Sequence, residues 1–155
     1  MHMTVRTKAC AVAGFALAAG VAFVFFGAGR GTASGSAQPS LPTGAELEQL
    51  RAIGLNAAAA NGDAHPTDGA VFASSRGDAM NATNGGVVDS NQSIYLIRLH
   101  GNFVANDARV PPGHAAPRGH VLIVVVDAAT NQVTDWGVGD NEPNQSALGP
   151  SAPIG

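Results

Sequence analysis

Residues 93–138 limit the possible folds most, because outside the N-terminal segment no other stretch has a comparable density of apolar and β-branched side chains. The stretch consists of SIYLIRLHGNFV, a connection rich in proline and glycine, and HVLIVVVDAATNQVTDWGV. Strand periodicity places one set of apolar residues on a single face: Tyr95, Ile97, Leu99 and Phe103. Residues 121–126 are continuously apolar, as in a central strand covered on both faces. The stretch therefore predicts two long strands and, after a tight turn, a third.

The tight turn is predicted at residues 127–132, where Asn131 suits a left-handed conformation and Asp127 can accept hydrogen bonds from turn amides. The third strand covers residues 133–138 and would place Thr134, Trp136 and Val138 on one face. For Trp136, the only tryptophan, packing under a helix is expected in preference to an exposed position as a ligand anchor. Residues 70–76 predict a shorter strand, and residues 77–86 fit either a helical turn or a loop.

A helix is predicted before these strands. Thr43 and Glu46 have the spacing of a capping box, and Gly62 is suited to a left-handed C-cap. Between them, small and apolar residues recur at helical spacing and would form a shallow face against the sheet: Leu47, Leu50, Gly54, Ala57 and Ala58. The predicted fold class is therefore α+β, with one N-terminal helix packed on an antiparallel sheet of three to five strands.

The N-terminus has the pattern of an export signal. Arg6 and Lys8 precede residues 9–29, which carry no charge, and a small-residue tether follows. The small residues at Ala33 and Ala37 favour a cleaved signal peptide, which would make the protein secreted. The length of the apolar run favours a retained single-pass anchor, since about 20 apolar residues span a bilayer. Both alternatives place the later part of the chain outside the membrane.

The predicted organisation is a signal peptide or anchor with its tether at residues 1–37, a single α+β domain at residues 38–140, and a poorly ordered tail at residues 141–155. The only cysteine is Cys10, so the domain contains neither a disulfide nor a thiolate metal site. Beyond residue 37 there are five arginines, no lysine and eleven acidic residues, a formal charge of −6. This charge argues against a nucleic-acid partner.

The string V-D-A-A-T-N-Q-V at residues 126–133 resembles the hairpin of PepSY-type domains of exported bacterial proteins, with Asn131 where that family commonly has glycine. The alanine- and glycine-rich composition of the chain also resembles that of small uncharacterised exported proteins of high-GC Gram-positive bacteria. The resemblance implies a cystatin-like helix against a curved sheet and an association with protease modulation at the cell envelope. The signature Q-x-V-x-G of inhibitory cystatins is not present at residues 92–96, so the resemblance implies no inhibitory residue in this chain.

The connection at residues 105–119 is long for a compact domain, and loops of this length are often functional. It is a candidate binding loop through Arg109, His114 and Arg118. The chain shows no recognised catalytic or cofactor motif, which favours a non-enzymatic domain without a cofactor that binds a protein or peptide, through this loop or an exposed sheet edge. The alternative is an exported metal-binding domain that uses His100, His114 and His120.

Overall fold

The computed structural model describes residues 39–83 and 88–154. The predicted signal or anchor and its tether, residues 1–37, lie outside these residues. Within the described ranges, no helix is both long enough and apolar enough to cross a membrane.

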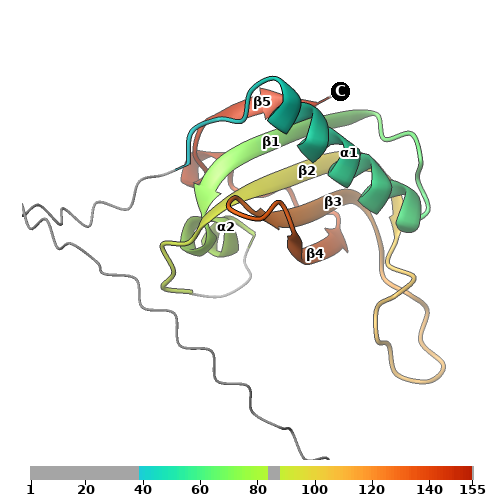
Figure 1. Ribbon diagram of the computed structural model, residues 1–155. Coiled ribbons are helices and arrows are strands. Elements are labelled where there is room, and N and C mark those ends of the chain that lie inside the picture. The colour runs from blue at the N-terminus through green and yellow to red at the C-terminus, as the bar shows by residue number, and fades with distance from the viewer. Residues whose placement is uncertain (1–38, 84–87, 155) are drawn as a thin grey trace, which may run out of the picture. The chain divides into compact units, whose positions relative to one another are not determined.

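The protein is α+β, with two α-helices and an antiparallel sheet of five strands among the described residues (Figure 1). The elements are α1 (Ala45–Ala60), β1 (Asp68–Ser75), α2 (Arg76–Ala82), β2 (Ser93–Val104), β3 (Arg118–Asp127), β4 (Val133–Gly139), the 3-10 helix η1 (Gln145–Ala147) and β5 (Ser151–Pro153). The strand order is β4-β3-β2-β1-β5. The predicted α+β class and antiparallel sheet are confirmed, and the bounds predicted for β2 are those observed.

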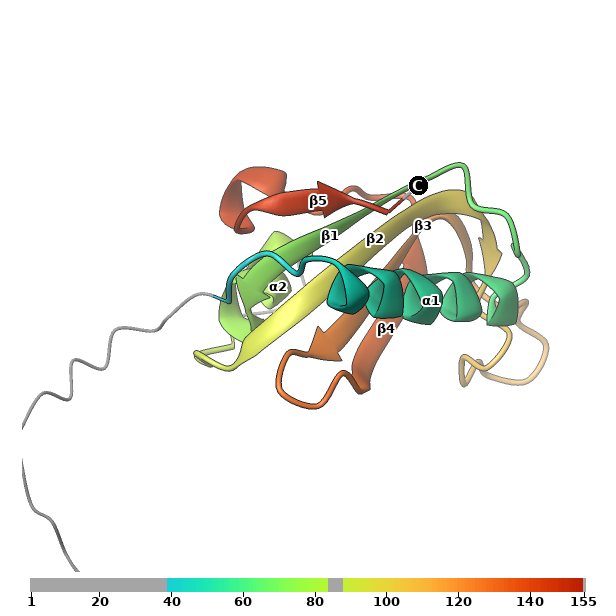
Figure 2. The same cartoon turned by 45° about the horizontal axis from the view of Figure 1, so that its top comes forward.

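The two helices cover opposite faces of the sheet (Figure 2). On the α1 face, Leu50 and Ala58 pack on side chains of the three central strands, including Ile97 and Leu122. Gly54 allows this approach, because a Cβ there would lie 3.1 Å from the Ile97 side chain. The small-residue face predicted for the helix is thus confirmed.

On the other face, Ala79 and Ala82 of α2 pack with Phe72, Leu96 and Val125. The helix is capped at its start by the Ser75 hydroxyl, which accepts a hydrogen bond from the Asp78 amide at 3.1 Å. Residues 77–86, for which the sequence left helix and loop open, thus contain most of α2. Side chains that alternate along β2 and β3 thus contribute to two separate cores, one on each face of the sheet.

The predicted capping box at the start of α1 is wrong. The N-cap residue is Gly44, without a side-chain cap, and the Glu46 carboxylate instead accepts a hydrogen bond of 3.0 Å from the hydroxyl of Tyr95. Tyr95 is only 4% exposed, so its hydroxyl needs a partner and takes the carboxylate from the helix terminus. At the other end Gly62 has a φ of 92°, as predicted for a left-handed residue after the helix.

The turn between β3 and β4 confirms the sequence prediction. Asn131 has a φ of 54°. Asp127 accepts hydrogen bonds from the amides of Ala129 and Thr130 and from the Thr130 hydroxyl, at 3.0, 2.9 and 3.0 Å. These bonds favour the charged carboxylate: the Thr130 hydroxyl, followed by the Gln92 amide, lowers the pKa of Asp127.

The predicted poorly ordered tail is also corrected. Residues 151–153 form β5, which pairs with the outer edge of β1. Leu148 and Ile154 are only 8% and 5% exposed and anchor the segment in the two cores. The proline, glycine and serine content of the tail predicts disorder. Three paired residues and two buried side chains nevertheless suffice to hold the tail on the edge of the sheet.

Candidate functional site

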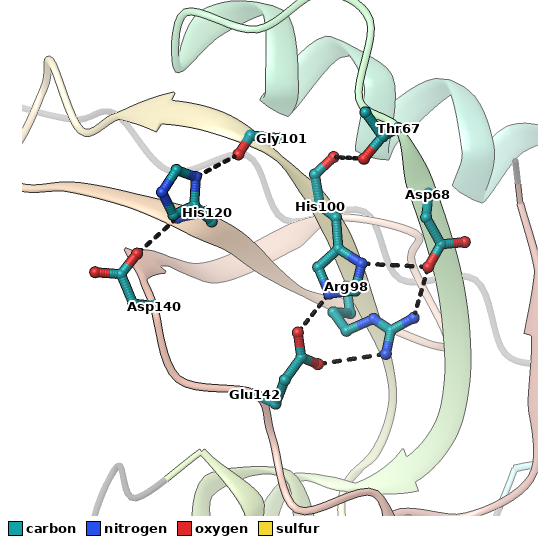
Figure 3. Close-up of polar contacts among 8 residues, drawn as sticks. All are labelled: Thr67, Asp68, Arg98, His100, Gly101, His120, Asp140 and Glu142. Atoms are coloured by element: carbon teal, nitrogen blue, oxygen red, sulfur yellow. Dashed lines mark hydrogen bonds and ion pairs between the residues drawn. The ribbon is translucent and has the colours of Figure 1, made fainter.

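A network of four polar side chains, Arg98, His100, Asp68 and Glu142, lies on the α2 face of the sheet (Figure 3). Arg98 and His100 lie two residues apart on β2 and so share a face. Asp68 pairs with His100 in the register of β1 and β2, and Glu142 comes from the segment after β4. The Arg98 guanidinium lies 3.1 Å from Asp68 and 3.3 Å from Glu142. The His100 ring contacts the same two carboxylates, with its Nδ1 3.2 Å from Asp68.

This network has a structural role. The Arg98 side chain is 11% exposed, whereas the Asp68 and Glu142 side chains are 56% and 45% exposed. A buried guanidinium is costly unless carboxylates compensate its charge. Both carboxylates are already engaged by cations, which leaves neither in the position of a free general base. The network instead fixes the segment around Glu142 against β1 and β2.

The structure separates the three histidines of the metal hypothesis. His100 belongs to the ion-pair network, His120 directs its Nδ1 to the Gly101 carbonyl at 3.2 Å (Figure 3), and His114 is exposed in the loop. The described part of the chain contains no group of three or more His, Cys, Asp or Glu side chains arranged to hold a metal ion. The geometry therefore gives the metal hypothesis no support.

The candidate binding loop projects from the sheet beyond the ends of β2 and β3 (Figures 1 and 2). Arg109 and His114 are exposed within it, and Arg118 is the exposed first residue of β3. Its base is closed by a hydrogen bond of 2.8 Å from the Ala105 amide to the Pro117 carbonyl. That these three side chains bind a partner stays a prediction.

A groove of about 360 Å³ lies on the α2 face beside β4, and we call it the β4 groove. Its floor is made by alternate residues of two paired strands: Val121, Ile123 and Val125 of β3 beside Gly139, Gly137 and Asp135 of β4. Met80 and Thr83 line it from the α2 side, and Asn141 and Glu142 from the segment after β4. The groove is thus apolar at its base and carries two carboxylates.

Gly137 and Gly139 leave the β4 side of this floor bare. A Cβ at either position would meet nothing within 4 Å, and neither residue has a positive φ. Neither packing nor backbone conformation therefore requires glycine there. Glycine in a strand costs roughly 0.5–1 kcal/mol relative to alanine, and it often marks the close approach of a ligand or another backbone.

The opposite face of β4 carries the largest exposed apolar side chains of the strand. Val133 and Trp136 are 47% and 38% exposed, so the prediction that Trp136 packs under the helix is wrong. The helix α1 packs mainly over β2 and β3, and Trp136 stays exposed beside it. Contrary to the sequence prediction, Thr134 does not share a face with Trp136. A bulge in β4 opposite Val125 and Val126 turns Thr134 to the α2 face, where its hydroxyl accepts a hydrogen bond of 3.1 Å from Arg76.

Sequence reasoning did not find Asp68, Glu142 or the β4 groove. Asp68 and Glu142 meet Arg98 only through strand pairing and chain return, which no local pattern reveals. The groove did leave a signal in the sequence: Asp135 and Gly137 alternate within the predicted strand, and Gly139 continues the alternation directly after it. Two glycines on one face of a strand indicate a face without side chains.

Comparisons of the chain with protein-family models, with curated proteins and with solved structures found no match. The resemblance to PepSY-type domains therefore stays a prediction.

Proposed function

We propose that the chain is an exported, non-enzymatic protein whose folded domain binds an extended peptide segment along β4. Export is supported by the N-terminal sequence pattern. Binding is supported by the position of β4, the last strand on its side of the sheet, whose outer edge pairs with no other described strand. Unpaired amides and carbonyls on such an edge can add a peptide as a further strand.

The observation that carries the proposal is the bare floor at Gly137 and Gly139. A peptide strand beside β4 directs every second side chain to the α2 face. With no Cβ on β4 at two successive positions of that face, such side chains can reach over β4 to Ile123, the partly exposed residue of the β3 floor. An edge without a ligand would gain stability from side chains at these positions, because the space for them is open.

The orientation of the exposed apolar residues supports the same surface. Val133 and Trp136 point to the α1 face of β4 and would flank the alternate side chains of an added peptide. Trp136 is also the only tryptophan of the chain, so its fluorescence reports on binding at this strand directly.

The test uses the full chain in non-ionic detergent and an array of eight-residue peptides. We expect a subset of peptides to bind and to shift Trp136 fluorescence, and we expect Gly137→Val to abolish their binding without lowering thermal stability. Methylation of alternate peptide amides should also abolish binding, because it removes the backbone donors.

The matched control is Ala115→Val, which enlarges an exposed side chain in the projecting loop and should leave binding unchanged. If no peptide binds, or if bound peptides are insensitive to Gly137→Val, β4 is not the binding surface. Loss of binding in Ala115→Val alone would move the site to the loop at residues 105–117.

A further inference from the structure

We propose that the peptide side chains directed into the β4 groove are basic, so that the preferred ligand is an extended segment with Lys or Arg at alternate positions and apolar residues between them. The inference rests on the proposed function, since it assigns the chemistry of the peptide bound at that surface. It follows from the charges along the groove and from the apolar floor between them.

Asp135 supplies the first charge. It lies on the α2 face of β4, opposite Val125. Its carboxylate accepts a hydrogen bond of 2.9 Å from the Trp136 amide and has no ion-pair partner among residues 39–83 and 88–154. It is exposed at the edge strand itself, next to the path of an added peptide.

Glu142 supplies the second charge, from the wall formed after β4. It is shared with Arg98 and His100, but its side chain is still 45% exposed. Of the cations around the groove, Arg98 is held between Asp68 and Glu142, whereas Arg76 donates to the neutral hydroxyl of Thr134 and keeps its charge. With an overall formal charge of −6 beyond residue 37, the field at the groove favours a cation.

The apolar floor selects a long cationic side chain. The aliphatic stem of Lys or Arg can lie on the partly exposed Ile123 and across Gly137, while its charged end remains near the carboxylates and water. A purely apolar side chain would remove water from the carboxylates without compensating them. An acidic side chain would be repelled.

The other face of the added strand has a different environment. Its side chains would lie beside Val133 and Trp136 of β4, where apolar or aromatic cross-strand neighbours are favourable. Successive side chains of a strand point to opposite faces. The bound peptide is therefore expected to alternate basic residues, on the α2 face, with apolar residues, on the α1 face.

The experiment compares three labelled eight-residue peptides by fluorescence anisotropy with the full chain in non-ionic detergent. They alternate valine with arginine, glutamine or glutamate. We expect the arginine peptide to bind at least tenfold more tightly than the glutamine peptide, and the glutamate peptide not to bind. Asp135→Asn should reduce the preference for arginine about fivefold, whereas Asp107→Asn, in the exposed loop, should leave it unchanged.

The outcomes separate this inference from the proposed function. Equal affinities of the arginine and glutamine peptides, both lost in Gly137→Val, would overturn the basic preference and keep the peptide site. An arginine preference reduced equally by Asp107→Asn and Asp135→Asn would mean non-specific attraction to an acidic domain and would also overturn the inference. Binding that Gly137→Val does not affect would overturn the proposed function itself.

Discussion

Replacement of Ile154 by alanine tests whether the C-terminal segment is part of the folded core. Ile154 is 5% exposed, and its amide donates a hydrogen bond of 3.0 Å to the carbonyl of Gly69. Its side chain fills space that two glycines leave open. A Cβ at Gly69 would lie 2.9 Å from Ile154 Cγ1, and a Cβ at Gly54 would lie 3.8 Å from Ile154 Cδ1.

The expected loss follows from this geometry. Truncation of a buried isoleucine to alanine costs about 2–5 kcal/mol, depending on how far the site collapses. Gly54 and Gly69 have no side chains that could move into the cavity, which favours the upper half of this range. The position near the chain end sets a limit, because β5 can detach instead of enclosing a cavity. We therefore expect a loss of about 3 kcal/mol, a large share of a typical stability of about 5–15 kcal/mol.

Urea denaturation of the full chain in non-ionic detergent, followed by far-ultraviolet circular dichroism, measures this loss. Val110→Ala is the matched control, since Val110 is 37% exposed in the projecting loop and its truncation should cost less than about 0.5 kcal/mol. If Ile154→Ala costs no more than Val110→Ala, the segment after β4 does not pack on the sheet. Neither the pairing of β5 with β1 nor the position of the groove wall would then hold.

Three further outcomes are expected. Burial and a hydrogen bond to a glutamate carboxylate raise the pKa of Tyr95 to about 12, so absorbance titration of this single tyrosine should give a midpoint well above the ordinary tyrosine pKa of 10.0. The stability conferred by its proton is complete below pH 10 and should be lost as the pH rises from 10 to 12. The pKa of Asp127 is lowered, so its contribution should be present above about pH 4 and be lost on acidification; thermal melts of Asp127→Asn should lack this part of the pH dependence. Gly119→Ala should lower the unfolding temperature, because its Cβ would lie 2.2 Å from the Gly139 carbonyl oxygen, whereas the same change at Gly137 should not lower it.

The features that local sequence determines were predictable. The bounds of β2, the left-handed Asn131 and the small face around Gly54 each depend on periodicity or turn chemistry within a few residues. The predicted capping box at Glu46 failed although its spacing was correct, because a buried tyrosine 49 residues away takes the carboxylate. A local rule gave way to a tertiary contact that satisfies a buried polar group.

The candidate site was less predictable because it depends on which strands pair and where the chain returns. His100 and His120 flank the same loop in sequence, yet His100 turns to Asp68 and Glu142 while His120 turns to a backbone carbonyl. Trp136 was expected to be buried because it is large and lies in a strand. Its exposure follows from the position of β4 at the edge of the sheet, whereas α1 packs mainly on β2 and β3.

The open edge at β4 does not result from a lack of chain to cover it. Eleven residues connect β4 to β5, and they run from one edge of the sheet to the other across the α2 face, where Leu148 is buried. The connection leads into β5, which covers the edge of β1. Within the connection, the ion pair with Arg98 holds Glu142 at the wall of the β4 groove. The same segment thus closes one edge and shapes the surface beside the other. Breaking the Arg98–Glu142 contact should therefore alter peptide binding at β4 without changing any residue of that strand.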